Sequence, residues 1–372
     1  MNFQTLCEVK GGLEARESNV YELRVINFIK KHKRHLPALA LVLGLIWDSL
    51  TLGRPDELYG NIVLLSYLII AGFSIMLMAR RELLKKEPKL WLSLIIQFSF
   101  GNLAGGLLVL YIGSATLVGN WPFLLILLGL LVGNEIFKTR YKRLCFNTVV
   151  YYLLILLYSI LIVPVLFRSI APWTFLVSAA LSLVVISLFL FFLRYVADDV
   201  LAQSKKILRS SIVLLLVIFG TLYYSNLIPP VPLAVRDIGI FHSIKRTGGG
   251  YAVTYEKQPW YKFLKKSDTT IYLLNSNTAS CFSAIFAPSE LDVSIFHVWE
   301  LFDTGSKEWV ERGRFDFPIV GGRIAGYRGY SEKTVSEGMW RCSVETKRGA
   351  LLGRVAVTVS TGSAQELVTS IR

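Results

Sequence analysis

The chain has four histidines and four cysteines, and these residues are the first candidates for chemistry. His32, His35, His242 and His297 are too few and too far apart in the sequence to suggest a metal site. The sequence also lacks a nucleophile elbow, a phosphate-binding Gly-rich loop, a zincin helix and a paired-cysteine zinc motif. We therefore expect no cofactor, no metal and no catalytic residues.

Two of the cysteines, Cys281 and Cys342, lie in the polar C-terminal part of the chain. Only one disulfide is possible within that part, and it forms if the part lies on an oxidising side of a membrane. Closing the loop of about 60 residues between these cysteines stabilises a domain by up to about 4 kcal/mol on the chain-entropy model. The alternative is a pair of buried free thiols. Cys7 and Cys145 lie in segments that we place at the cytoplasmic face.

Polar side chains inside long apolar runs are the next candidates, because each is costly in hydrocarbon. We find six of them: Asp48, Gln97, Asn102, Asn134, Glu135 and Asn147. Glu135 precedes Lys138 by three residues, so an ion pair at the membrane surface explains it. The alternative is an intramembrane polar site formed by Asn102, Asn134 and Glu135, which would indicate a transporter or lipid flippase.

Gly101 and Gly105 have the small-xxx-small spacing that allows two helix backbones to approach closely. Helix packing is the simpler interpretation of this pattern. A Gly-interrupted helix at a transport site is the alternative.

In the C-terminal part, His297 and Trp299 alternate and therefore share one face of an expected strand. A Gly-rich stretch that we expect to be a loop adds cations and an aromatic ring, namely Arg323, Tyr327, Arg328 and Lys333. An aromatic face beside cations can hold a sugar ring, a peptide strand or an acidic group. The alternative is a core tryptophan anchored by hydrogen bonds of the histidine and arginine.

The elements that position these residues follow from composition. The chain is 53% hydrophobic and 18% charged, which is too apolar for an ordinary soluble protein of 372 residues. Spanning a membrane takes about 20 apolar residues as a helix. Seven runs qualify: Leu36–Leu52, Asn61–Met78, Trp91–Ile112, Trp121–Phe137, Phe146–Phe167, Thr174–Leu193 and Ile212–Ile228.

The net charge of +14 gives the orientation. Of the 40 Lys and Arg residues, 20 lie in four segments that alternate with the other loops: residues 1–35, 80–89, 138–143 and 194–209. This positive-inside pattern places the N-terminus in the cytoplasm and predicts contact with anionic lipids of the inner leaflet. It accounts for the charge without nucleic-acid binding. Seven crossings then leave the C-terminal part outside.

We therefore divide the chain into a basic, amphipathic cytoplasmic segment (1–35), a seven-helix transmembrane domain (36–229) and a β-rich domain (230–372). Short β-branched and aromatic segments separated by Gly, Asn, Asp and Ser predict about eight strands and a two-sheet, all-β sandwich. The expected strands are Ala234–Ile244, Tyr251–Glu256, Thr270–Leu274, Cys281–Phe286, Ser294–Phe302, Phe315–Val320, Gly338–Glu345 and Leu351–Ser360.

The β-rich part resembles the family catalogued as domain of unknown function 2914. The residues that carry this resemblance are Cys281 to Pro288, His297 to Glu300, Gly321 to Arg328, Ser331, Lys333, Gly338 to Cys342 and Leu351 to Arg354. The membrane part is similar to unknown-function family 5924. There the matching residues are Phe98 to Gly101, Tyr111, Ser114, Ala115, Asn134, Glu135 and Arg140 to Leu144.

The two resemblances imply a multi-pass inner-membrane protein of Gram-negative bacteria with a periplasmic β domain, and they imply no reaction. From the missing catalytic motifs and the aromatic and cationic residues, we expect the domain to bind a periplasmic partner protein, an envelope glycan or a lipid-linked ligand. The transporter or flippase is the alternative. A membrane enzyme that acts on lipid-linked substrates comes third.

Overall fold

The computed structural model describes residues 46–85, 90–136, 144–248, 250–256, 270–273, 277–287, 293–319, 327–362 and 366–372. The predicted N-terminal segment, most of the first predicted span and Arg323 lie outside these residues. Residues 46–51, at the end of that span, are helical.

Five long helices follow the order of the apolar runs: α3 (Leu58–Leu83), α4 (Leu90–Ile112), α5 (Leu117–Ile136), α6 (Leu144–Leu166) and α7 (Trp173–Tyr224). The helix α7 contains two spans, because its backbone leaves the helical conformation at Ala197. Six described helical segments are long and apolar enough to cross a membrane, so the chain is a multi-pass membrane protein. The six later runs that we predicted correspond to these helices, although α6 ends one residue before Phe167 and α7 four residues before Ile228, and Phe137 lies outside the described residues.

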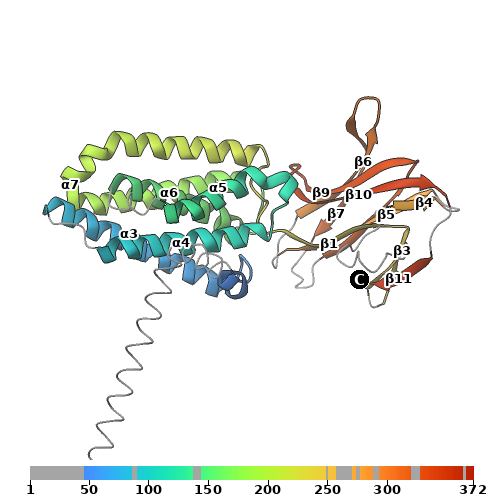
Figure 1. Cartoon of the computed structure of the whole chain (residues 1–372), viewed down its shortest axis with the longest axis horizontal. Coiled ribbons are helices and arrows are strands. Elements are labelled where there is room, and N and C mark those ends of the chain that lie inside the picture. Colours follow the sequence, from blue (N-terminus) through green and yellow to red (C-terminus); the bar gives the residue numbers. More distant parts are fainter. Residues whose placement is uncertain are drawn as a thin grey trace, which may run out of the picture. The chain divides into compact units, whose positions relative to one another are not determined.

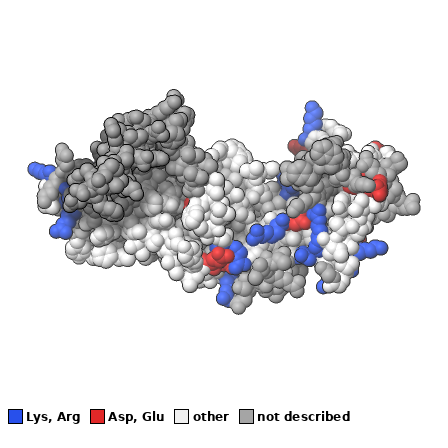
Figure 2. Space-filling view, turned by 60° about the horizontal axis from the view of Figure 1, so that its bottom comes forward, with Lys and Arg blue, Asp and Glu red and all other residues white. Residues whose placement is uncertain are grey.

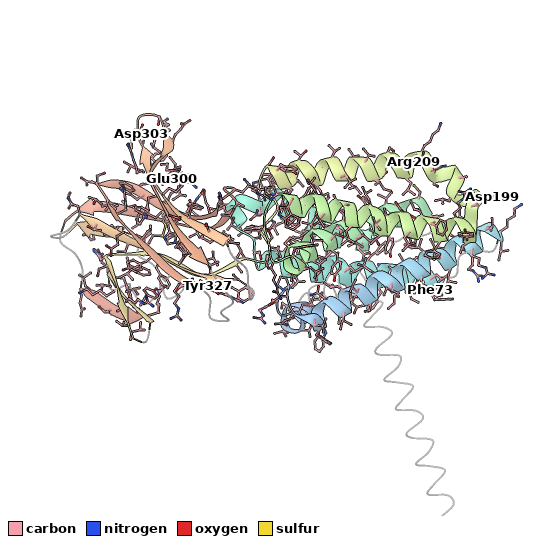
Figure 3. All side chains as sticks on the ribbon, turned by 180° about the vertical axis from the view of Figure 1, so that it is seen from behind. Phe73, Asp199, Arg209, Glu300, Asp303 and Tyr327 are labelled. Carbon is pink, nitrogen blue, oxygen red and sulfur yellow. A yellow bond between two sulfur atoms is a disulfide. The ribbon has the colours of Figure 1, made fainter. Side chains whose placement is uncertain are left out.

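The surfaces of these helices agree with a membrane environment. Large apolar side chains such as Phe73 point outward from the flank of the helical part (Figure 3). Lys and Arg side chains gather at one end of it, with uncharged residues along the visible flank (Figure 2). Asp199 and Arg209 lie near that end, where α7 breaks (Figure 3). Charged ends around an apolar flank are what a hydrocarbon layer requires.

Tyrosine hydroxyls tie the helices together in the interior. The buried Tyr111 of α4 donates to the carbonyl of Leu157 in α6 over 2.9 Å. The hydroxyl of Tyr158, also in α6, donates to the side-chain oxygen of Asn61 in α3 over 3.1 Å. In the absence of a hydrophobic driving force between helices, such hydrogen bonds and close packing hold a membrane bundle together.

The C-terminal part consists of eleven described strands (Figure 1): β1 (Ala234–Phe241), β2 (Ser243–Thr247), β3 (Gly250–Glu256), β4 (Thr270–Leu273), β5 (Thr278–Phe286), β6 (Val293–Asp303), β7 (Glu308–Ile319), β8 (Tyr327–Thr334), β9 (Gly338–Thr346), β10 (Leu351–Thr361) and β11 (Leu367–Ile371). They form a central sheet in the order β1-β5-β8, a five-stranded sheet in the order β4-β10-β9-β6-β7 and a small sheet in the order β11-β3-β2. Only the β4–β10 pair is parallel among the pairs of described strands.

The β-rich fold is confirmed, and five details of its prediction were wrong. The segment 234–244 forms two strands in different sheets, because the chain turns a corner at His242 between β1 and β2. The stretch around Tyr327 to Lys333 is strand β8, not a loop, and β11 was not predicted. The sandwich therefore gains a third sheet. The strand β7 also begins seven residues before Phe315.

Strand β5 holds the three sheets together because both of its faces are buried. Cys281 and Ile285 pack with residues of the five-stranded sheet. Phe282 and Ala284, which point the other way, pack with Phe241 and with residues of the small sheet. A strand buried on both sides explains why its sequence is a continuous apolar and small-residue run without the alternation of an exposed strand.

Candidate functional site

Cys281 and Cys342 form a disulfide in the interior of the β domain. Cys281 belongs to the central sheet and Cys342 to the five-stranded sheet, and both residues are fully buried. The bond therefore joins the two facing layers of the sandwich. Cys145, in α6, is a free thiol.

Next to the disulfide, His297 lies at the centre of a buried hydrogen-bond network. Its Nε2 is 2.8 Å from the hydroxyl of Ser283, and its Nδ1 is 3.0 Å from the hydroxyl of Ser331. The indole Nε1 of Trp299 donates to the same Ser331 hydroxyl over 3.0 Å. The network links β5, β6 and β8, and its histidine and tryptophan are both fully buried. His297 and Trp299 thus share one face, as predicted, and that face is the core.

The network fits a neutral imidazole. A neutral ring offers one donor and one acceptor, and two serine hydroxyls can satisfy both in either tautomer. An imidazolium would be a buried charge, and the contacts of this ring are hydroxyls and the ring of Phe317, 4.8 Å between centroids. Burial accordingly lowers the pKa of His297 to about 4.

Neither catalysis nor metal binding follows from this cluster. A serine hydroxyl that contacts a histidine resembles an activated nucleophile. Here, however, Ser283 is fully buried and no carboxylate among the described residues orients the ring. The side chains of Cys281, His297 and Cys342 lie within 4.8 Å of one another, but the two sulfur atoms are bonded together. They present no thiolates to a metal ion.

The other predicted ligand residues lie on two faces of β8. Tyr327 and Lys333 are half-buried on the same face as Ser331, while Arg328 is exposed on the opposite face. There Arg328 donates to the carbonyl of the C-terminal residue Arg372 over 3.2 Å. These residues therefore do not form one continuous surface with His297 and Trp299.

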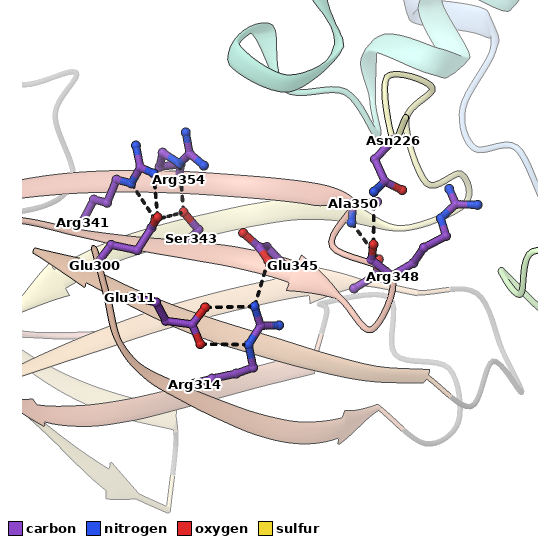
Figure 4. Close-up of polar contacts among 11 residues, drawn as sticks. Asn226, Glu300, Glu311, Arg314, Arg341, Ser343, Glu345, Arg348, Ala350 and Arg354 are labelled. Carbon is purple, nitrogen blue, oxygen red and sulfur yellow. Dashed lines mark hydrogen bonds and ion pairs between the residues drawn. The ribbon is translucent and has the colours of Figure 1, made fainter. Parts of the chain in front are cut away.

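The outward face of the five-stranded sheet carries a polar assembly that the sequence did not reveal. Glu300 of β6 accepts two hydrogen bonds from the guanidinium of Arg341 on β9, one from Nε and one from Nη2 at 2.6 Å (Figure 4). The same guanidinium stacks on the ring of Trp309 in β7, 4.3 Å from the ring centroid. Ser343 donates to Glu300 over 3.3 Å and accepts from Nε of Arg354 over 2.8 Å. We call these five residues the guanidinium cluster.

A second arginine on this face is fully paired. Arg314 of β7 donates from Nε and Nη2 to the carboxylate of Glu311, each over 3.2 Å, and its Nη2 lies 3.7 Å from Glu345 (Figure 4). These contacts raise the pKa of Arg314, the hydrogen bond with Glu311 most of all. A bulge explains the pairing, because the register of β6 and β7 shifts between Gly313 and Glu311 and so brings Glu311 to the same side as Arg314.

The residues of the predicted intramembrane site, Asn102, Asn134 and Glu135, do not share one set of contacts. Asn134 of α5 is buried and donates to the main-chain carbonyl of Gln97 in α4 over 3.0 Å. Asn102 donates to the carbonyl of Phe98 within its own helix. A Cβ at Gly101 would lie 2.7 Å from the amide nitrogen of Asn134, so the glycine makes room for that side chain. Glu135 is helical, and its side chain lies outside the description.

A cavity of about 500 Å³ lies between α4 and α5, and its lining is apolar. The lining residues are Leu108, Ile112, Ala115, Leu117, Trp121, Leu124, Leu125 and Leu128. Neither Asn102 nor Asn134 lines it. A cavity without polar groups has no site at which a polar solute would bind.

Asn120 is a polar residue that the sequence analysis missed. It is buried, its side-chain oxygen accepts from the backbone N–H of Thr116, and its amide donates to the carbonyl of Leu227 over 3.0 Å. Asn226, just beyond α7, donates in turn to the carbonyl of Arg348 between β9 and β10 over 3.1 Å. The sequence gives little signal for these contacts, because Thr116 and Asn120 are four residues apart and do not have the three-residue spacing of a capping box.

Comparison with known proteins finds a family match for one stretch of the chain. Residues 292–359 match the family described as "Protein of unknown function (DUF2914)", which confirms the predicted resemblance for that stretch. No curated protein matches the chain. Among solved structures, the DNA glycosylase AlkC of Pseudomonas fluorescens, bound to DNA with an abasic site analog, aligns over 83% of this chain and 99% of its own. At 9% identity and a TM-score of 0.24 this alignment supports no conclusion about fold or function.

Proposed function

We propose that this chain is an inner-membrane protein of Gram-negative bacteria whose β domain lies in the periplasm and binds a partner protein or an envelope glycan without catalysis. The observation that carries the proposal is the outward face of the five-stranded sheet. There the guanidinium cluster holds two cations and an aromatic ring in positions that hydrogen bonds and ring stacking fix. Rigid side chains of this kind lose little entropy on binding.

The family match covers the strands that carry this face. Residues 292–359 contain β6, β7, β8 and β9 and most of β10. These strands include every residue of the guanidinium cluster. The proposed ligand surface therefore differs from the one expected from the sequence, since His297 and Trp299 are buried.

Two features support the periplasmic orientation. Basic residues alternate between successive loops of the membrane part in the positive-inside pattern. The β domain contains a disulfide, a bond that persists in oxidising compartments. The similarity of the membrane part to unknown-function family 5924 belongs to the same proposal, as does contact of the basic loops with anionic lipids.

A transporter or lipid flippase ranks second. It requires a polar path between the third and fourth spans, near Asn102, Asn134 and Glu135. Asn134 donates to the main-chain carbonyl of Gln97 in the neighbouring helix, and the cavity between α4 and α5 is apolar. These contacts favour packing over transport.

Site-specific photo-crosslinking in intact cells tests the proposal. A photoreactive residue at Thr358, exposed on the outward face of the five-stranded sheet, should trap a glycan or an envelope protein. The matched control is the exposed Lys245 of the small sheet, which should trap neither. The proposal fails if Thr358 traps nothing while liposomes containing the purified full-length chain translocate lipid or solute.

A further inference from the structure

The guanidinium cluster contains one arginine that has no carboxylate of its own. Arg341 and Glu300 form a bidentate pair. The side chain of Arg341 is 16% exposed and that of Glu300 is 14% exposed. Arg354, on the neighbouring strand β10, hydrogen-bonds through Nε to the neutral hydroxyl of Ser343. Within the residues that the structure describes, Arg354 has no ion pair, and the five residues of the cluster carry one excess positive charge. Glu345 also acts on Arg354, but it lies 3.7 Å from Arg314.

The strand register brings the two guanidinium groups close together. Arg354 pairs with Ser343 across β9 and β10, and Arg341 lies two residues from Ser343 on the same face. The two arginines appear side by side above Glu300 (Figure 4). Burial and the neighbouring charge of Arg341 both lower the pKa of Arg354. An anion beside them would relieve this repulsion.

The donors that remain point to an oxyanion. Arg341 uses Nε and Nη2 on Glu300, which leaves its Nη1 without a partner among the described residues. Nη1 and Nη2 of Arg354 likewise have no partner among the described residues. The stacking on Trp309 and the hydrogen bond to Ser343 fix the planes of the two groups. Fixed guanidinium edges match the geometry of carboxylate and phosphate.

We infer that Arg354 and Nη1 of Arg341 form a binding site for a carboxylate or phosphate group carried by an envelope glycan. This inference rests on the proposed function and names the chemistry of its ligand. The glycan lies across β9 and β10, where the exposed outward side chains of β10 beyond Arg354 are the small Ala356 and Thr358.

The surface composition favours a glycan over a protein partner. Protein interfaces need a core of large apolar side chains that become buried on binding. Among the described residues of this face, Met339 is the one large apolar side chain that is strongly exposed, at 45%. A charged sugar can bind through its oxyanion and hydroxyl groups without such a core.

Saturation-transfer NMR on the full-length chain in lipid nanodiscs tests the inference. The probes are glucuronate for a sugar carboxylate, glucose 1-phosphate for a sugar phosphate and methyl glucoside as the neutral sugar. The first or the second should bind and methyl glucoside should not. Arg354→Gln should weaken binding at least tenfold, and Arg354→Lys, which keeps the charge but loses the planar fork, should give an intermediate loss.

Arg314→Gln is the matched control, because Arg314 lies on the same face with its own carboxylates and should leave binding within twofold of the unmodified chain. Each variant is first checked for the intact disulfide between Cys281 and Cys342.

Equal binding by Arg354→Gln overturns the anion site, while the proposed function survives if crosslinking at Thr358 still traps a ligand. Tighter binding of a poly-glutamate peptide with the same dependence on Arg354 would assign the site to an acidic protein instead. The inference is overturned if neither glucuronate nor glucose 1-phosphate binds.

Discussion

At the scale of single residues, His297 makes the stability of the β domain depend on pH. Its folded-state pKa of about 4 lies below the ordinary value of 6.5, so between these pH values the unfolded chain binds more protons than the folded one. The stabilising contribution is complete above about pH 6.5 and is lost as the pH falls towards 4. The size of the shift corresponds to roughly 3 kcal/mol.

We expect His297→Gln to remove this dependence, because a glutamine amide can donate and accept without titrating. The measurement is the denaturant concentration at which half of the β domain is unfolded in the full-length chain. Hydrogen exchange reports this unfolding at several pH values between 4 and 7. Other acidic groups also titrate in this range, so the difference between the unmodified chain and the variant is the relevant quantity. Parallel curves for the two proteins would show that His297 does not titrate in this way.

The sequence predicted part of this network. Alternation along β6 correctly placed His297 and Trp299 on one face. It could not show whether that face is core or surface, because the answer depends on Ser283 and Ser331 from distant strands. The guanidinium cluster was missed for the same reason, since its members come from four strands and have no common motif.

At the scale of elements, the contact between α4 and α5 depends on Gly101. A methyl group there would lie 2.7 Å from the amide of Asn134, which must then move away from the carbonyl of Gln97. We expect Gly101→Ala to destabilise the bundle by about 1–2 kcal/mol through the lost hydrogen bond and the crowding. Thermal unfolding in detergent measures the effect.

Gly129 provides the matched control on the neighbouring helix. A Cβ there meets no atom within 4 Å, so Gly129→Ala should be neutral or slightly stabilising through the higher helix propensity of alanine. In an Asn134→Ala background, the cost of Gly101→Ala should largely disappear. An equal cost in both backgrounds would mean that Asn134 is not the neighbour that matters.

Helices and strands differ in how well the sequence predicts them. The transmembrane helices follow from continuous apolar runs, because hydrocarbon imposes the same demand on every residue. The strands are harder to predict, since β8 begins after a Gly-rich stretch and β11 is short with alternating exposure. The corner at His242 could not be predicted either, because pairing with β5 and β3 in different sheets determines it.

At the scale of the whole molecule, the number of spans determines the side of the membrane on which the β domain lies. The six described spans return the chain to the side where it began, so the predicted first span decides the orientation. The positive-inside pattern and the disulfide are independent of each other, and both support our proposal that the domain lies outside. Their agreement makes a labelling experiment decisive.

We expect a membrane-impermeant maleimide to label Ser306→Cys in intact spheroplasts, because Ser306 lies in the exposed turn between β6 and β7. It should label Lys205→Cys, in the basic segment of α7, only after the membrane is permeabilised. The pair is matched, since both positions are exposed and lie away from the disulfide. The reverse pattern would place the domain in the cytoplasm, where the disulfide would not persist and the envelope-binding role proposed for the outward sheet face would be excluded.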